Sequence, residues 1–406
     1  MKKSSFADIL QGLSDERSGK LATKLPSLPE IEVPTALALE QCSSEWAAKY
    51  KARAAAEFCG AHNGNSALAD LTGGLGIDCW AFSEHFGRLL YNDRNAVLGA
   101  AVKRNFEALG IKGVEFHNLD VSPDSTDWSD VLRAFSPDVI FLDPARRSAD
   151  GRKVFLLEDC SPCVPDLLPI LLDIAPKLVL KLSPMADISL IVKRLSEACS
   201  KAVSKRGLKE IKVVGLQGEC KELLCFIDAS FDAGCRITAV ELLRDGGAIS
   251  LSAPDADGPE SQISPDIRQG GIMAVPSAVL MKAGLHDVVC QSAGFAKADR
   301  FTHLYFGSPD RLPLLGNKEF FKFYEIIEVM PLNNANVREA GRRYPSADVT
   351  ARNIRMTSDE LRLRLGIRKP SGDCHIFGFA GSSGKLLAVC RQLNPADAPS
   401  RTERHP

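Results

Sequence analysis

The period of hydrophobic positions changes along the chain, and each change predicts a different kind of element. Residues 44–60 place alanines and aromatic residues at helical spacing, with Ser44 as a candidate N-cap and Gly60 as the stop. We therefore expect the N-terminal region to be helical. From about residue 67 to 228, short apolar runs alternate with amphipathic stretches of helical period. This alternation predicts an α/β fold with a mostly parallel, doubly wound sheet.

Three further patterns subdivide the rest of the chain. The runs IKVVGL and ELLCFID flank Gly218 and predict a terminal hairpin, and hence one antiparallel strand. A stretch rich in Gly, Pro and Asp, residues 252–266, is the candidate linker. Beyond it, residues 318–392 form a second compact unit, in which Thr357 and Glu360 have the spacing of a capping box. The last residues, NPADAPSRTERHP, have the composition of a flexible tail.

Composition narrows the class of protein. With 406 residues, of which 45% are apolar and 25% charged, the chain can form two or three domains with ample cores. A formal net charge of −1 means that nucleic-acid binding needs a local basic patch. No signal peptide and no run of about 18 uncharged apolar residues is present, so we expect no membrane association. The twelve cysteines are expected to be reduced thiols in the cytoplasm.

Cys160 and Cys163 have the C-x-x-C spacing. A structural zinc site needs four ligands, and no second pair with comparable spacing accompanies this one. We therefore expect no metal and interpret both cysteines as structural, with a redox role as the alternative.

Acidic residues follow four successive apolar runs at intervals of 23 to 27 residues: Asp70, Asp93, Asp120 and Asp143. The carboxyl ends of parallel strands share one edge of a sheet, so the four carboxylates are expected on one rim. Each alone is more often a loop cap than a ligand. Together they suit a cationic ligand that carries hydroxyl groups, and an acid after the second strand can accept both ribose hydroxyls.

The loop LTGGLG follows the first strand and contains Gly73, Gly74 and Gly76. Glycines there permit positive φ and let a ligand approach the backbone closely. Neither the G-x-G-x-x-G fingerprint nor the G-K-[ST] of a P-loop is present. The loop thus argues against a nicotinamide, flavin or nucleoside-triphosphate site.

These motifs resemble those of the class I S-adenosylmethionine-dependent methyltransferases. DLTGGLG resembles their first motif, and the resemblance implies S-adenosyl-L-methionine as the cofactor. The implied cofactor-binding residues are Asp70, Thr72, Gly73, Gly74, Gly76, Asp78, Asp93 and Asp120. DPAR resembles their D/N-P-P-x motif beside the transferred methyl group, which implies Asp143, Pro144 and Arg146 as catalytic residues.

A closer resemblance covers nearly the whole chain. LEQCSSEWAAKYKA, DLTGG-G-D, DPARR, KLSPMAD and ECKELL occur in the order found in a family of these enzymes with a THUMP-like C-terminal domain. It implies a Rossmann-like sheet followed by small α+β ferredoxin-like and THUMP-like units. The implied limits are 1–62 for a helical region, 63–232 for the methyltransferase domain, 233–312 for a connecting, ferredoxin-like segment, 313–393 for the THUMP-like domain and 394–406 for the tail.

THUMP-type modules bind RNA, so the resemblance implies methylation of a base in RNA, with tRNA and rRNA both open. Arginines outnumber acids in the C-terminal unit, which favours an RNA-docking surface there. Its candidate residues are Arg342, Arg343, Arg352 and Arg355. We expect Lys51 and Arg53, on the N-terminal helix, to face solvent. The segment KLSPMAD, with Lys181, Ser183, Pro184 and Asp187, is a further rim candidate.

The chain departs from the D/N-P-P-x motif at Ala145 and Arg146, which replace the second proline and an aromatic residue. An arginine plane can stack on a base or clamp a phosphate. Methylation of a pyrimidine carbon would need a cysteine nucleophile, for which Cys160 and Cys163 are nearby in sequence. The methylated atom therefore stays open. The altered motif also supports an alternative, a non-catalytic RNA-binding module on the same fold.

Overall fold

The fold was obtained as a computed structural model, which describes residues 19–61, 64–146, 157–253, 263, 267–315, 318–368 and 374–393. The chain divides into two compact units. The N-terminal unit consists of Met1–Leu216 and Lys221–Ala248, and the C-terminal unit of Gln217–Cys220 and Ile249–Pro406. Among the helices of the described ranges, none has both the length and the apolar character needed to cross a membrane.

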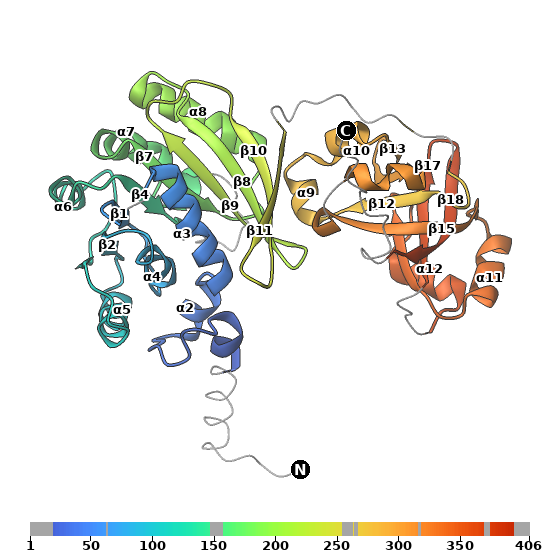
Figure 1. The fold of residues 1–406 in the computed structure, drawn as a ribbon, viewed down its shortest axis with the longest axis horizontal. Coiled ribbons are helices and arrows are strands. Elements are labelled where there is room, and N and C mark those ends of the chain that lie inside the picture. The colour runs from blue at the N-terminus through green and yellow to red at the C-terminus, as the bar shows by residue number, and fades with distance from the viewer. Residues whose placement is uncertain are drawn as a thin grey trace, which may run out of the picture. The chain divides into compact units, whose positions relative to one another are not determined.

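Within the described residues, a nine-stranded sheet has the order β11-β10-β8-β9-β7-β4-β1-β2-β3, and every strand except β11 lies wholly or mainly in the N-terminal unit (Figure 1). Its strands are β1 (Ala67–Asp70), β2 (Arg88–Asn92), β3 (Val114–His117), β4 (Val139–Leu142), β7 (Lys177–Leu182), β8 (Leu208–Leu216), β9 (Glu219–Asp228), β10 (Arg236–Leu242) and β11 (Ala248–Ala253). β7, β4, β1, β2 and β3 are parallel to one another, whereas β9 runs antiparallel to β7. The expected parallel sheet with its antiparallel strand is confirmed.

Helices cover both faces of this sheet (Figure 1). On one face lie α3 (Glu45–Cys59), α4 (Ile77–Phe82) and α5 (Ala96–Ala108), and on the other α6 (Asp127–Phe135), α7 (Val164–Ile174) and α8 (Ile188–Val203). A short helix, α2 (Ala36–Gln41), precedes α3. The Ser44 side chain caps α3 and Gly60 ends it in the left-handed conformation, as predicted. The alanine-rich face of α3 packs into the core of the unit.

The expected hairpin consists of β8 and β9. Gln217 and Gly218 connect them, with φ of 57° and 78°. Two residues of positive φ form the tight turn whose twist matches that of the strands. Beyond the hairpin, β10 pairs in parallel with β8, so this sheet continues past residue 232.

The C-terminal unit contains, among its described residues, a seven-stranded sheet of order β13-β14-β12-β15-β18-β17-β16. Its strands are β12 (Ile272–Pro276), β13 (Ala296–Asp299), β14 (Thr302–Gly307), β15 (Phe321–Pro331), β16 (Asp348–Arg352), β17 (His375–Gly381) and β18 (Gly384–Gln392). Its helices are α9 (Ala278–Lys282), α10 (His286–Ser292), α11 (Asn334–Arg343) and α12 (Ser358–Leu365). β12 pairs with β15, so the connecting segment and the last strands share one sheet.

Helices α11 and α12 bury their apolar residues against one face of this second sheet. Val337 and Ala340 of α11 and Leu361 and Leu365 of α12 belong to one core cluster. The capping box predicted at Thr357 is confirmed, because Thr357 and Glu360 each accept a hydrogen bond from the other's backbone N–H.

Candidate functional site

A cavity of about 810 Å³ lies at the carboxyl ends of the parallel strands, entirely within the N-terminal unit. This is the edge at which open α/β sheets bind ligands, and the volume is that of a small-molecule site. Eight of the residues predicted for the site line it: Thr72, Gly73, Gly74, Asp78, Asp93, Asp120, Asp143 and Pro144. The tertiary fold therefore brings together residues separated by more than 70 positions in the sequence.

Two predicted cofactor-binding residues, Asp70 and Gly76, do not line the cavity. Asp70 is 1% exposed, and its Oδ1 accepts a hydrogen bond from the Thr72 N–H at 3.1 Å. Its Oδ2 accepts none from the described residues. Burial, with the nearby Asp78 carboxylate, raises the pKa of Asp70 well above its usual value. Asp70 therefore stabilises the glycine loop through this hydrogen bond and does not itself line the cavity.

Each glycine of the loop is held by a close contact or an unusual backbone angle. At Gly73 an added Cβ would lie 2.1 Å from the ring of Tyr91. At Gly76, where φ is +78°, it would lie 2.5 Å from Cγ1 of Val102. Gly74 has φ of +52° and nothing within 4 Å of such an atom, so its conformation, not crowding, favours glycine. The loop is packed against β2 and α5 as well as open to the cavity.

Asp93, directly after β2, holds the glycine loop in place. Its Oδ2 accepts a hydrogen bond from the Gly74 N–H at 2.8 Å, and its Oδ1 accepts one from the Asn95 N–H at 2.8 Å. The hydroxyl of Tyr91 donates to the Gly74 carbonyl at 2.7 Å. A carboxylate has about four acceptor positions, so Asp93 retains acceptor capacity toward the cavity.

Asp143 is fixed from two sides. Its N–H donates to Oγ1 of Thr72 at 2.6 Å, which ties the DPAR segment to the glycine loop. Its Oδ2 accepts a hydrogen bond from the Lys181 ammonium at the end of β7. Burial opposes the charge on Lys181, but the carboxylates of Asp143, Asp78 and Glu222 together raise its pKa above the usual value. Lys181 is therefore a cation beside Asp143 throughout the neutral range.

The other rim candidates of KLSPMAD have different positions. Ser183 and Pro184 line the cavity together with Lys181. Asp187 instead caps helix α8, where its Oδ1 accepts a hydrogen bond from the Leu190 N–H at 2.9 Å. The segment contributes one charged side chain, Lys181, to the site.

Sequence reasoning missed a buried ionic cluster behind the cavity. We expected Lys51 to face solvent, and this was wrong: Lys51 is 1% exposed. Its Nζ lies 2.9 Å from Oε2 of Glu222, 3.2 Å from Oδ1 of Asp78 and 2.8 Å from Oγ of Ser43. The Ser43 hydroxyl donates to Oδ2 of Asp78 at 2.9 Å. Arg53, by contrast, is exposed as expected.

The hydrophobic periodicity of α3 and β9 could have predicted that Lys51 and Glu222 are buried. Lys51 shares a helix face with Ala48, Ala52 and Ala55, all of which are completely buried. In β9, Glu222 alternates with Leu224 and Phe226, which face the core. A lysine and a glutamate on two apolar faces are expected to be partners, since unpaired charges are rarely buried.

The DPAR segment forms a small ribbon at the cavity rim. β5 (Ala145–Arg146) pairs antiparallel with β6 (Cys160–Ser161), and both Ala145 and Cys160 line the cavity. The side chain of Arg146 and residues 147–156 lie outside the described part of the chain. Burial and the neighbouring Asp166 raise the pKa of Cys163 to about 11, so this thiol is protonated at neutral pH.

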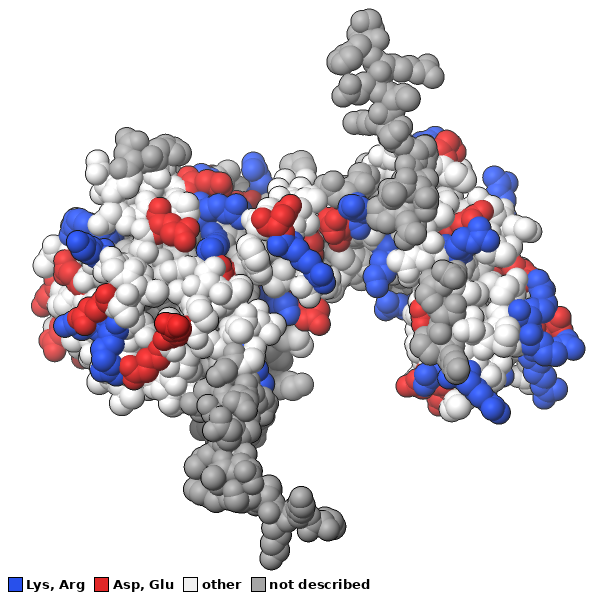
Figure 2. Space-filling model, turned by 60° about the horizontal axis from the view of Figure 1, so that its bottom comes forward, with Lys and Arg blue, Asp and Glu red and all other residues white. Residues whose placement is uncertain are grey.

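The predicted RNA-binding arginines fall into two groups in the C-terminal unit. Arg342 pairs with Glu339 on α11, and Arg343 pairs with Glu328 at 2.8 Å. Arg352 and Arg355 are exposed near the end of β16. Lysines and arginines gather along the edge of this unit that α11 and α12 form (Figure 2). In the described residues, no cluster of three or more His, Cys, Asp or Glu is placed to hold a metal.

Comparison with known proteins supports the fold expected for each of the two units. Residues 321–392 match the THUMP domain-like family. A crystal structure of a candidate methyltransferase from Porphyromonas gingivalis W83 is similar over 94% of this chain and 89% of its own, with a TM-score of 0.78 and 25% identity. No curated protein matches. The expected methyltransferase-type fold with a THUMP-like C-terminal domain is thereby confirmed.

Other solved structures align only in part. A SAM-dependent methyltransferase from Agrobacterium tumefaciens has a TM-score of 0.30 and 15% identity, with 51% of this chain and 58% of that chain covered. A T. Thermophilus 16S rRNA methyltransferase in complex with AdoMet and guanosine has a TM-score of 0.30 and 12% identity, with 48% and 43% covered.

Proposed function

We propose that this protein is a cytoplasmic S-adenosylmethionine-dependent methyltransferase that modifies a base in RNA. The observation that carries the proposal is the cavity, in which a glycine loop and the carboxylates of Asp93, Asp120 and Asp143 meet at the strand ends. The similarity to a candidate methyltransferase along most of the chain supports the reaction class. The THUMP-like match supports RNA as the substrate. The cytoplasmic location rests on the twelve cysteines, whose irregular spacing is typical of reduced thiols.

The residues of the cavity fit this cofactor. Asp93 has acceptor capacity for ribose hydroxyls, and Asp120 lies along the same rim. Gly73 and Gly74 leave room for a ligand against the backbone. When bound, S-adenosylmethionine supplies a methyl group on a positively charged sulfur, and the carboxylates of the rim favour that charge.

Asp143 and Pro144 would present the base to this methyl group. Lys181 occupies Oδ2 of Asp143, so Oδ1 remains as an acceptor for an N–H of the base. Displacement at a sulfonium depends chiefly on alignment, and Thr72 fixes the backbone of Asp143 against the cofactor loop. We assign Arg146 to contact with the base or its phosphate.

Calorimetry with S-adenosylhomocysteine tests the cofactor assignment. Asp93→Ala should weaken binding about tenfold or more, since it removes acceptors of charge-assisted hydrogen bonds. Asp124→Ala is the matched control, because Asp124 is exposed and does not line the cavity. If neither the product S-adenosylhomocysteine nor S-adenosylmethionine binds the intact protein, the proposal is wrong.

Transfer of a labelled methyl group to total RNA separates an enzyme from a non-catalytic binding module. Asp143→Ala should reduce transfer at least a hundredfold while cofactor binding is kept. Transfer by neither protein, with cofactor and RNA both bound, would favour the binding module. If the wild type transfers the methyl group, nucleoside mass spectrometry of cells with and without the gene identifies the modified base.

A further inference from the structure

A group of exposed residues lies where turns of the C-terminal unit meet. Phe301 is in the turn between β13 and β14, and Arg352 and Arg355 are at the end of β16. Nδ2 of Asn353 donates to Oγ1 of Thr302 at 3.2 Å and so joins the two turns directly. We call Phe301, Arg352 and Arg355 the turn surface.

Phe301 is unusually open for its size. The residue is 69% exposed, and the guanidinium of Arg300 lies 5.5 Å from the centre of its ring. A single exposed apolar residue is common and by itself indicates nothing. Here Arg300 lies beside the ring, and the Thr302–Asn353 hydrogen bond connects the Phe301 turn with the segment that carries Arg352. Aromatic rings in such surroundings are typical of surfaces that bind single-stranded nucleic acid.

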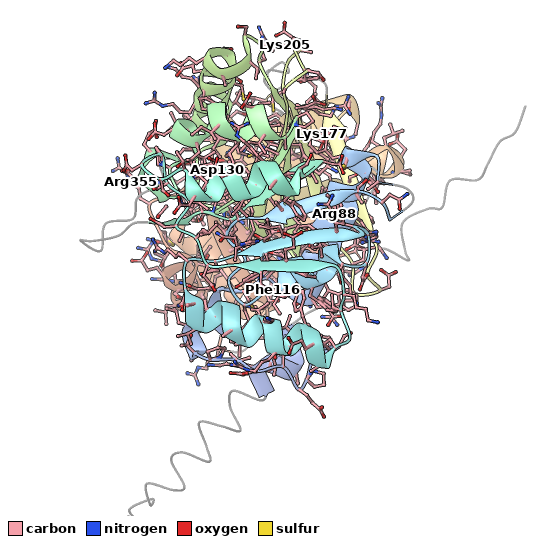
Figure 3. All side chains as sticks on the ribbon, turned by 90° about the vertical axis from the view of Figure 1, so that its left-hand side faces the viewer. Arg88, Phe116, Asp130, Lys177, Lys205 and Arg355 are labelled. Atoms are coloured by element: carbon pink, nitrogen blue, oxygen red, sulfur yellow. The ribbon has the colours of Figure 1, made fainter. Side chains whose placement is uncertain are left out.

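The positive charge of this surface is open to a ligand. Arg352 and Arg355 form no ion pair with any residue that the structure describes, and Figure 3 shows the Arg355 side chain extending away from the ribbon. Arg342 and Arg343, in contrast, are paired with Glu339 and Glu328. A cation without a carboxylate partner is the better phosphate ligand.

Three acids close in sequence to the turn surface have partners of their own. Oδ1 of Asp299 accepts a hydrogen bond from the Phe301 N–H at 3.3 Å. Asp359 pairs with Arg362 at 2.7 Å, and Oε2 of Glu360 accepts from the Thr357 N–H at 2.7 Å. Neither these acids nor Asp348, four residues before Arg352, forms an ion pair with Arg352 or Arg355 among the described residues, so both guanidinium groups stay available to a ligand.

We propose that the turn surface binds an unpaired segment of RNA, with one base stacked on Phe301 and the adjoining phosphates on Arg352 and Arg355. The proposal rests on the proposed function, in which the ligand is RNA, and adds that the docked segment is single-stranded. Bases within a duplex stack on one another and leave no face for an aromatic side chain. Phe301 precedes residues 321–392, so the connecting segment contributes to RNA docking together with the THUMP-like strands.

Fluorescence anisotropy with a labelled oligouridine and with an RNA duplex of the same length tests the stacking. The full-length protein should prefer the single strand. Phe301→Ala should weaken oligouridine binding about tenfold, while Phe301→Trp should keep it. Leu363→Ala is the matched control, since Leu363 is 77% exposed in the same unit and is expected to change nothing.

The salt dependence of binding tests the two arginines. Joint replacement Arg352→Ala and Arg355→Ala should lower the slope of log affinity against log salt by about 1.4, or about 0.7 for each phosphate left without its arginine. The same replacements at Arg342 and Arg343 should change the slope less, because those side chains are paired.

The outcomes distinguish this proposal from the proposed function. Unchanged oligouridine binding by both Phe301→Ala and the Arg352/Arg355 variant overturns the turn surface but leaves RNA methylation in place. Preference of the intact protein for the duplex overturns it as well. Absence of any RNA binding, with S-adenosylmethionine still bound, overturns RNA as the substrate and this surface with it.

Discussion

A lysine ammonium inside a protein is stable only beside carboxylates, and Lys51 has two of them. Lys51→Met would leave Glu222 and Asp78 buried without their cation. Breaking a buried pair in this way should lower the free energy of unfolding by about 3–5 kcal/mol. Urea denaturation of the full-length protein measures this decrease in the free energy of unfolding.

A second replacement checks that the loss comes from the unpaired charge. The double variant Lys51→Met, Glu222→Leu should recover part of the stability, because it replaces one of the two carboxylates left without Lys51, while Asp78 remains. Arg104→Met is the control: it breaks a solvent-exposed pair with Glu32 and should change the free energy of unfolding far less. Equal losses for Lys51→Met and Arg104→Met would contradict the assignment.

Asp70 predicts a dependence on pH. Burial and Asp78 raise its pKa in the folded state, so the folded protein binds the proton more tightly than the unfolded chain does. Its contribution to stability is therefore complete below the ordinary carboxyl pKa of 3.8 and decreases as pH rises toward the folded-state pKa. Asp70→Asn keeps the acceptor for the Thr72 N–H and removes this decrease.

The comparison of unfolding free energies at several pH values checks this prediction. The stability of Asp70→Asn relative to wild type should increase from about pH 4 upward. Asp124→Asn, at an exposed position, should show no such trend. A constant difference between Asp70→Asn and wild type across this range would show that Asp70 titrates normally.

At the scale of elements, the glycine loop depends on contact with helix α5. Gly76→Ala would combine a left-handed backbone with a clash against Val102, and should destabilise the protein by about 2–4 kcal/mol. Gly74→Ala meets no atom within 4 Å and should cost only about 1–2 kcal/mol. Thermal denaturation compares the stability of the two variants. Equal losses of stability would exclude the contact with Val102 of α5 as the cause of the Gly76→Ala effect.

In the second sheet, His375 of β17 makes stability sensitive to acid. Burial lowers the pKa of His375 to about 4, against the opposing carboxylate of Asp348. The unfolded chain takes up this proton near pH 6.5, so the stability contributed by neutral His375 decreases as pH falls from about 6.5 to about 4. His375→Gln should flatten the pH dependence of unfolding of the C-terminal unit in this range. An unchanged slope would mean that His375 does not titrate there.

At the scale of the whole molecule, the two compact units should respond differently to a cofactor. The cavity lies within the N-terminal unit, so S-adenosylhomocysteine at a hundred times its Kd should stabilise that unit by about 2.7 kcal/mol. Hydrogen exchange should show added protection in residues 67–121 and none in residues 321–392. Equal protection of both would mean that the units unfold as one.

Much of this molecule follows from the sequence alone. The caps of α3 and α12, the hairpin at Gly218 and the alternation of strands and helices depend on local patterns, and all are confirmed. The acidic strand ends could be placed at one edge because parallel topology puts them there. For the same reason, most of the residues predicted for the cavity do line it.

Only the tertiary structure decided which side chains are paired and which are open. Lys51 and Glu222 are 171 positions apart, and their contact depends on how α3 packs on the sheet. Likewise, only the folded structure shows that Arg342 and Arg343 have carboxylate partners, whereas Arg352 and Arg355 form no ion pair among the described residues. Local propensity acts over a few residues, whereas burial and charge pairing depend on distances that exist only once the chain has folded.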